Sequence, residues 1–82
     1  MLGTKRSPLN LAFGRVLRNL RLKADLSQEE LGLEAEIQRN YISLIELGHN
    51  QPTISIIFKI SKALKIKPAK LIQLVDEESQ SH

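Results

Sequence analysis

The chain has 82 residues, no cysteine and a formal net charge of +3. This length allows one small domain, and the absence of cysteine excludes disulfides and thiolate-bound zinc as sources of stability. Aromatic residues make up only 4% of the chain, so its core must be mostly aliphatic, which favours a compact helical bundle. No apolar run approaches the roughly 20 residues of a membrane span, and no signal-peptide pattern is present, so we expect a cytoplasmic protein without membrane contact.

Basic residues are concentrated in two stretches, 5–23 and 59–70, and neither stretch contains an acidic residue. The segment between them holds six acidic residues and only one basic residue, Arg39. Two basic flanks of this kind could contact phosphates on either side of a helix docked on DNA. The charges alone are explained at least as well by solvated helix surfaces, so they do not decide the function.

The first expected helix begins after Ser7, which is a good N-cap, with Pro8 at the first helical position. Residues 1–7 ahead of it are expected to form a flexible basic arm. Apolar residues then recur at three- and four-residue steps up to Asp25, where the helix should end. This stripe is expected to be buried and consists of Leu9, Phe13, Val16, Leu17, Leu20 and Ala24.

Two short helices follow, over about residues 28–35 and 38–47. Ser27 and Glu30 have the spacing of a capping box, in which each side chain bonds a backbone N–H at the start of the helix. Ile37 should anchor the turn between the two helices. Gly48 closes the second of them, because glycine adopts the left-handed conformation of a helix C-terminus at little cost.

Thr53 caps the expected fourth helix, whose buried stripe is Ile56, Ile57, Ile60 and Leu64. Pro68 begins the fifth, which carries Leu71, Ile72 and Val75. Residues 76–82 are polar and acidic, and we expect them to form a disordered tail. The folded domain should therefore span residues 8–75.

Three segments together resemble the Cro/phage-repressor (XRE) helix-turn-helix family. They are Leu-Ser-Gln-Glu-Glu-Leu at 26–31, Tyr-Ile-Ser-Leu-Ile-Glu-Leu-Gly at 41–48, and Pro-Thr at 52–53. Residues 39–46 are also similar to the controller proteins of restriction–modification systems. The resemblance implies a compact, all-α, five-helix fold like that of lambda repressor, with the second and third helices as the helix-turn-helix. It further implies a sequence-specific regulator of transcription that binds double-stranded DNA.

The third helix should present one face to the core and one to the major groove. At 100° per residue, Ile42 and Ile45 point inward, while Arg39 and Asn40 point outward. Arginine can bond guanine with its fork, and asparagine can bond adenine. The resemblance places base contacts at Gln38, Arg39, Asn40, Ser43 and Leu44. The alternative is that these are merely the soluble positions of an amphipathic helix.

Phosphate contacts are expected around this helix, at Gln28, Tyr41, His49, Asn50 and Gln51. Gln28 and Tyr41 also have simpler explanations, as a surface residue of a helix and as a packing residue. Glu46 lies near the buried face, where an unpaired carboxylate would be costly. The resemblance suggests that Arg21 pairs with it. One departure from the family is Glu36, which stands in a turn where glycine is usual; a positive φ there costs on the order of 1 kcal/mol.

We expect a homodimer, because one small helix-turn-helix makes few contacts and two-fold symmetry doubles them on an inverted-repeat operator. The expected interface is Ile66, Leu71, Ile72 and Val75. A rival hypothesis is a protein-interaction module of the same fold, such as an antitoxin or a co-activator, which exposed Leu33, Leu44 and Leu47 would favour. No catalytic residues, cofactor or metal site are expected, since the two histidines have no partner at ligand spacing.

Overall fold

The computed structural model describes residues 7–81, and these form five helices with no strand. The helices are α1 (Pro8–Lys23), α2 (Gln28–Ala35), α3 (Arg39–Glu46), α4 (Ile54–Ala63) and α5 (Pro68–Gln80). The predicted all-α, five-helix architecture is confirmed. Most of the predicted basic arm, residues 1–6, lies outside the described residues.

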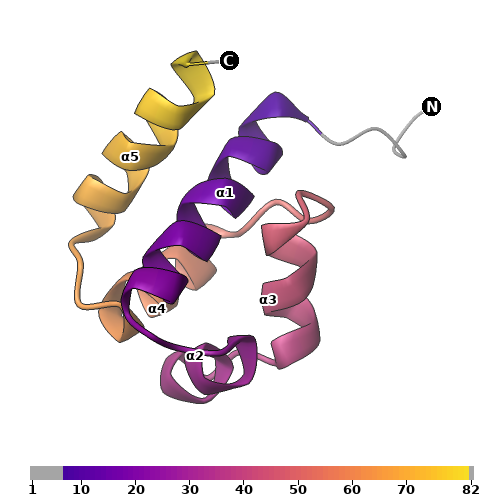
Figure 1. Cartoon of the computed structure of the whole chain (residues 1–82), viewed down its shortest axis with the longest axis vertical. Coiled ribbons are helices and arrows are strands. Elements are labelled where there is room, and N and C mark those ends of the chain that lie inside the picture. Colours follow the sequence, from indigo (N-terminus) through magenta and orange to yellow (C-terminus); the bar gives the residue numbers. More distant parts are fainter. Residues whose placement is uncertain (1–6, 82) are drawn as a thin grey trace.

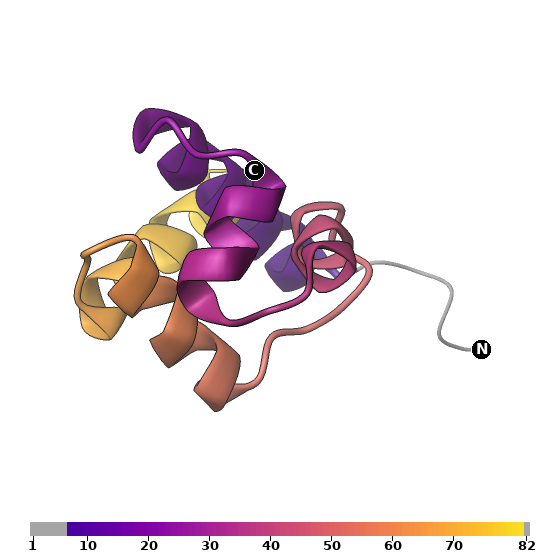
Figure 2. The ribbon, with the colours of Figure 1, turned by 90° about the horizontal axis from the view of Figure 1, so that it is seen from below.

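Helix α1 runs through the middle of the molecule, with α5 along one side and α3 on the other (Figure 1). Helix α2 crosses the end of α1, and α4 lies behind it between α2 and α5. Seen from below, α2 leads through a short turn into α3, and a longer loop returns from α3 to α4 (Figure 2). The core between the helices is aliphatic except for Phe13; its fully buried members are Ala12, Leu17, Leu31, Ile42, Ile45, Ile60 and Leu71.

Three helices begin at the predicted caps. The hydroxyl of Ser7 accepts the backbone N–H of Asn10 at 3.0 Å, and that of Thr53 accepts the N–H of Ile56 at 3.2 Å. At α2 the capping box is complete: Ser27 Oγ accepts the Glu30 N–H, and the Glu30 carboxylate accepts the Ser27 N–H. These bonds satisfy donors that a helix start otherwise leaves open, which fixes where each helix begins.

Four helix ends share one hydrogen-bond pattern, in which a backbone N–H past the end of the helix reaches a carbonyl five residues earlier. The pairs are Leu26 to Arg21, Ile37 to Gly32, His49 to Leu44 and Ile66 to Ser61. This closure needs a residue with positive φ between helix and exit. Gly48 provides it after α3 with φ 80°, whereas Asp25, Glu36 and Lys65 adopt φ of 57–62° at the other three ends. Glu36 does adopt a positive φ, so the cost that the sequence analysis attached to that conformation applies in this turn.

The predicted disordered tail is wrong for residues 76–80, which continue helix α5 to Gln80. Glu78 lies against α1 and accepts a bond from Arg15 Nε at 2.8 Å. Two contacts along α5, from Gln73 to Glu77 and from Gln80 to Asp76, join side chains one turn apart. The prediction of disorder rested on the polar composition of this segment. It did not take into account the contact with α1, which accompanies the extension of the helix.

Some residues predicted to be buried are exposed, and some predicted to lie on the surface are buried. Leu9 and Ala24, at the two ends of the expected α1 stripe, are exposed. On α5, Leu71 and Val75 are buried inside this one chain, so the prediction that they contact a second chain is wrong. Ile72 is 46% exposed and Ile66 is half-buried. Only these two of the four predicted interface residues remain accessible.

Candidate nucleic-acid interface

Helix α3 is divided into an inward and an outward face. Ile42 and Ile45 have no exposed surface, whereas Arg39 and Asn40 lie exposed in the first turn. The outward face continues one turn later with half-buried Ser43 and with Leu44, which is 38% exposed. Exposed Gln38 caps the helix start through its backbone, without a side-chain cap bond. All five predicted base-contact residues thus retain accessible surface, four on α3 and Gln38 at its N-cap.

The position of α3 depends on close backbone contact with α1. A Cβ atom added to Gly14 would collide with the backbone carbonyl groups of Ile45 and Glu46. Those contacts are with backbone atoms, which cannot move aside as a flexible side chain can. Glycine at this place therefore lets the end of α3 rest directly on the middle of α1.

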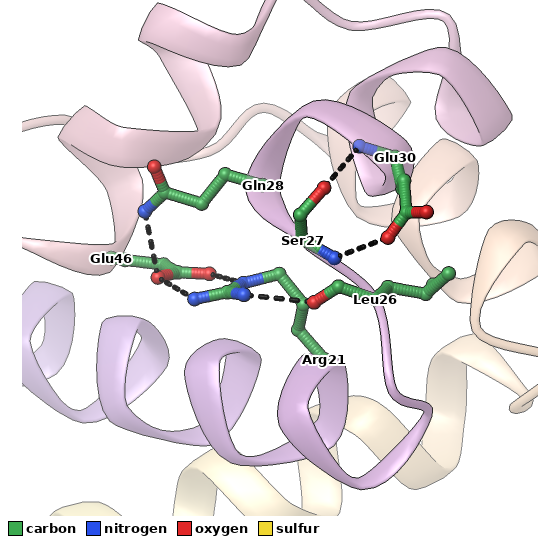
Figure 3. Close-up of polar contacts among 6 residues, drawn as sticks. All are labelled: Arg21, Leu26, Ser27, Gln28, Glu30 and Glu46. Atoms are coloured by element: carbon green, nitrogen blue, oxygen red, sulfur yellow. Dashed lines mark hydrogen bonds and ion pairs between the residues drawn. The ribbon is translucent and has the colours of Figure 1, made fainter.

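A buried ion pair fixes the same junction (Figure 3). Arg21 on α1 donates from Nε to Glu46 Oε2 at 2.6 Å and from Nη2 to Oε1 at 3.0 Å. The remaining Nη1 donates to the backbone oxygen of Leu26 at 2.9 Å, just before α2. The Arg21 and Glu46 side chains are only 8% and 3% exposed. The geometry is bidentate, the strongest form of this interaction.

The pKa of the Arg21 guanidinium is raised above its ordinary value. The main cause is the hydrogen bonding to Glu46, helped by the attraction of the carboxylate charge, while burial acts in the opposite direction. A raised arginine pKa means that the folded state holds this proton more tightly than the unfolded state. The stabilisation is present below the unfolded pKa and is lost only above it, so Arg21 stays charged throughout the physiological range.

Gln28 joins this pair from the first turn of α2. Its amide nitrogen donates to Glu46 Oε1 at 3.0 Å (Figure 3). We call the three side chains Arg21, Gln28 and Glu46 the polar brace. The brace connects α1, the start of α2 and the end of α3, so a single carboxylate links all three helices.

Comparisons with known proteins agree with this geometry. The chain matches the helix-turn-helix family over residues 17–71. It is 43% identical over 65 residues to control protein C.BamHI of Bacillus amyloliquefaciens, covering 78% of this chain and 80% of that protein. The chain belongs to the helix-turn-helix family.

Solved structures extend the likeness of this helix-turn-helix chain to the whole fold. The restriction-modification controller protein C.AhdI from Aeromonas hydrophila aligns with a TM-score of 0.74 at 35% identity, covering 76% of this chain and 94% of that one. The controller protein C.Esp1396I gives a TM-score of 0.84 at 28% identity, covering 93% and 99%. The predicted membership of the XRE-type family and the similarity to controller proteins are confirmed.

The expected phosphate-contact residues lie around α3 at different depths. His49 and Gln51 are exposed in the loop after the helix, while Asn50 and Tyr41 are half-buried. Tyr41 also packs against the core, so a packing role and a phosphate role are both open to it. Gln28 differs from the others, because its amide is already bonded within the protein.

The predicted pairing of Arg21 with Glu46 is present in the structure, whereas the sequence analysis missed that Gln28 joins it. The capping box indicated that Gln28 begins α2, but not that its side chain faces the end of α3. Among residues 7–81 no group of His, Asp and Glu side chains could hold a metal ion. Within the same range, none of the helices has the length and apolar character to cross a membrane.

Proposed function

We propose that this helix-turn-helix protein regulates transcription as a homodimer that binds an inverted repeat in double-stranded DNA. The observation that carries the proposal is the division of α3, with aliphatic residues fully buried on one face and Arg39 and Asn40 exposed on the other. An α-helix of this kind fits the major groove, where each base pair presents a distinct set of donors and acceptors. The polar brace and the Gly14 contact hold this helix rigidly, which base readout requires.

The outward residues of α3 have complementary chemistry. Arg39 can donate two bonds to guanine O6 and N7, and Asn40 can bond adenine N6 and N7. Ser43 can reach a base edge or a phosphate, and exposed Leu44 can cover a thymine methyl. Gln38, at the start of the helix, adds an amide that can both donate and accept. His49, Asn50 and Gln51 in the following loop are placed next to this face and can contact phosphates.

A second copy of the chain is the best candidate to cover the α4–α5 face, which we define as Ile54, Phe58 and Ile72. These side chains are 72%, 58% and 46% exposed. Ile72 also lines an apolar groove of about 540 Å³ between the start of α1, α4 and α5, together with Leu9. Large apolar side chains that are exposed together on a small domain are typical of a protein–protein interface. In a two-fold dimer, the two α3 helices would read half-sites roughly 34 Å apart.

The likeness to controller proteins suggests that the regulated gene is the protein's own. The first experiment is a fluorescence-anisotropy titration on the DNA immediately upstream of this gene, with scrambled DNA as competitor and several salt concentrations. Binding that resists the competitor and weakens with salt supports the proposal. Equal, weak binding to both DNAs contradicts autoregulation through that site.

Substituting Arg39 tests the role of α3 directly. Arg39→Ala should weaken binding to the upstream DNA by about 1–3 kcal/mol, since a bidentate contact to one base is worth that much. Binding to scrambled DNA should change much less. Glu34→Ala, at an exposed position of α2, serves as the control. An equal loss on both DNAs would assign Arg39 to the phosphates instead of the bases.

A second candidate function is a protein-interaction module, such as an antitoxin or a co-activator. It is favoured by Leu33, which is 76% exposed on α2 among acidic side chains that DNA would repel. A protein partner could cover it together with Leu47, which is 51% exposed. If Leu33→Ser abolishes the capture of a partner while DNA binding persists, the chain has this function as well.

A further inference from the structure

Gln28 is half-buried at the first position of α2, and its side chain faces the interior of the molecule. Its amide nitrogen lies 3.0 Å from Glu46 Oε1, an oxygen that also accepts from Arg21 Nη2 at 3.0 Å. Glu46 therefore receives three hydrogen bonds, two from α1 and one from α2. Removing Gln28 would leave the carboxylate tied to α1 alone.

The bond to Glu46 determines how the Gln28 amide is oriented. A carboxylate only accepts hydrogen bonds, so the NH₂ group must face it, and the amide oxygen points to the opposite side (Figure 3). A DNA phosphate also only accepts, so it cannot bond this oxygen and could reach only the second N–H of the amide. In addition, Glu29 and Glu30 place two carboxylates in the same first turn. The contact with Glu46 therefore fixes the orientation of the Gln28 amide in the free protein.

We propose that Gln28 is a positioning residue, which acts on DNA recognition through Glu46 by fixing the angle between α2 and α3. The inference rests on the proposed function, because it assigns a role within DNA readout. The turn between the two helices is short, and its Glu36 adopts a φ of 58°, a conformation that costs on the order of 1 kcal/mol. The Gln28 bond ties the far end of α3 back to the start of α2. Without it α3 can shift, and a shift of about 1 Å misaligns side chains with base edges.

The first test is a double-mutant cycle with Q28A, E46M and the double variant, because methionine matches the length of glutamate but removes both acceptor oxygens. The quantity measured is the ratio of affinities for the upstream DNA and for scrambled DNA. Q28A should lower this ratio about tenfold, the effect of one hydrogen bond to a charged group. In the E46M background, where Gln28 has lost its acceptor, Q28A should have little further effect. An equal loss in both backgrounds overturns the proposal, since Gln28 would then act on DNA directly.

Gln51→Ala provides the matched control, because this amide lies in the loop after α3 and has no contact with the polar brace. Its effect on DNA affinity should be the same in the parent protein and in E46M. If Gln51→Ala depends on Glu46 as strongly as Q28A does, the cycle reports general loosening of the fold, and the specific role of Gln28 is rejected.

The second test needs no DNA. Q28E keeps the size of the side chain but places a carboxylate against Glu46, and this repulsion raises the pKa of the new group. The loss of stability should be present above that raised pKa and should vanish below about pH 4.3, the ordinary glutamate value. We expect the urea midpoint of Q28E to lie below that of the parent at pH 7 and to approach it on acidification.

An unchanged midpoint at pH 7 overturns the proposal, because a residue that acts only on phosphate would not affect the free protein. Failure of the proposed function is recognised separately. In that case the parent protein shows no preference for the upstream DNA, while Q28E still lowers the midpoint.

Discussion

The polar brace and the α4–α5 face differ in how completely the single chain satisfies them. In the brace, Glu46 is 3% exposed and accepts three hydrogen bonds from two other helices. On the α4–α5 face, Ile54 and Phe58 are more than half exposed. One chain is therefore sufficient to position α3, whereas the α4–α5 face leaves large apolar side chains exposed.

The largest effect is expected at the centre of the brace. Glu46→Ala should lower the free energy of unfolding by about 3–5 kcal/mol, because Arg21 would remain buried without its partner. Urea denaturation of the variant and the parent measures the difference. Glu34→Ala on the exposed face of α2 should change it by less than about 0.5 kcal/mol. If Glu46→Ala unfolds at the same urea concentration as the parent, the brace does not stabilise the junction.

The next effect concerns the α4–α5 face. Ile72→Glu should weaken the dimer by about 2 kcal/mol or more, because it places a charge within a desolvated apolar contact. Sedimentation equilibrium measures the change, and Ser55→Glu, which adds the same charge at an exposed position of α4, is the control. If the parent protein stays monomeric at tens of micromolar, the proposal that a second copy covers the α4–α5 face is wrong.

The contact between α1 and α3 should be intolerant of a single methyl group. Gly14→Ala should destabilise the protein by about 1–3 kcal/mol, since the added carbon meets backbone carbonyls that cannot repack. Thermal unfolding measures the loss, and Asn19→Ala at an exposed position of the same helix is the control. A gain in stability from Gly14→Ala, as expected for a freely exposed helix position, would show that the two helices are farther apart.

The smallest effect is a gain. Glu36→Gly should stabilise the protein by about 1 kcal/mol, because glycine adopts a φ of 58° without the steric cost of a side chain. The release of strain is partly offset by the greater freedom of glycine in the unfolded chain. Lys65→Gly tests the same effect at the end of α4, far from α3. If neither variant is more stable, the helix ends are not strained.

The sequence predicted the parts of the fold that depend on local chemistry. Ser7, Ser27 and Thr53 marked three helix starts, because a hydroxyl that caps a helix acts within a few residues. The face that α5 turns to the core was not predictable in this way. Leu71, Ile72 and Val75 are all aliphatic, and only packing against α1 and α4 determines that Ile72 stays outside.

In the candidate site, too, the sequence predicted the features that depend on local pattern and missed a contact that depends on tertiary packing. The periodicity of α3 was enough to separate Ile42 and Ile45 from the outward residues. The family resemblance was needed for the pair between Arg21 and Glu46, which lie 25 positions apart. The bond from Gln28 to Glu46 could be seen only in three dimensions, because a surface glutamine at the start of a helix has many other acceptable roles.

The division of α3 also has a consequence for how such a protein can evolve. The residues that hold the helix in place, Ile42, Ile45 and Glu46, are all different from those that face outward. Substitutions at Arg39, Asn40 or Leu44 therefore leave the core untouched and should alter stability by only a few tenths of a kcal/mol. A lineage carrying this scaffold can exchange one set of outward side chains for another and acquire a new target without first refolding.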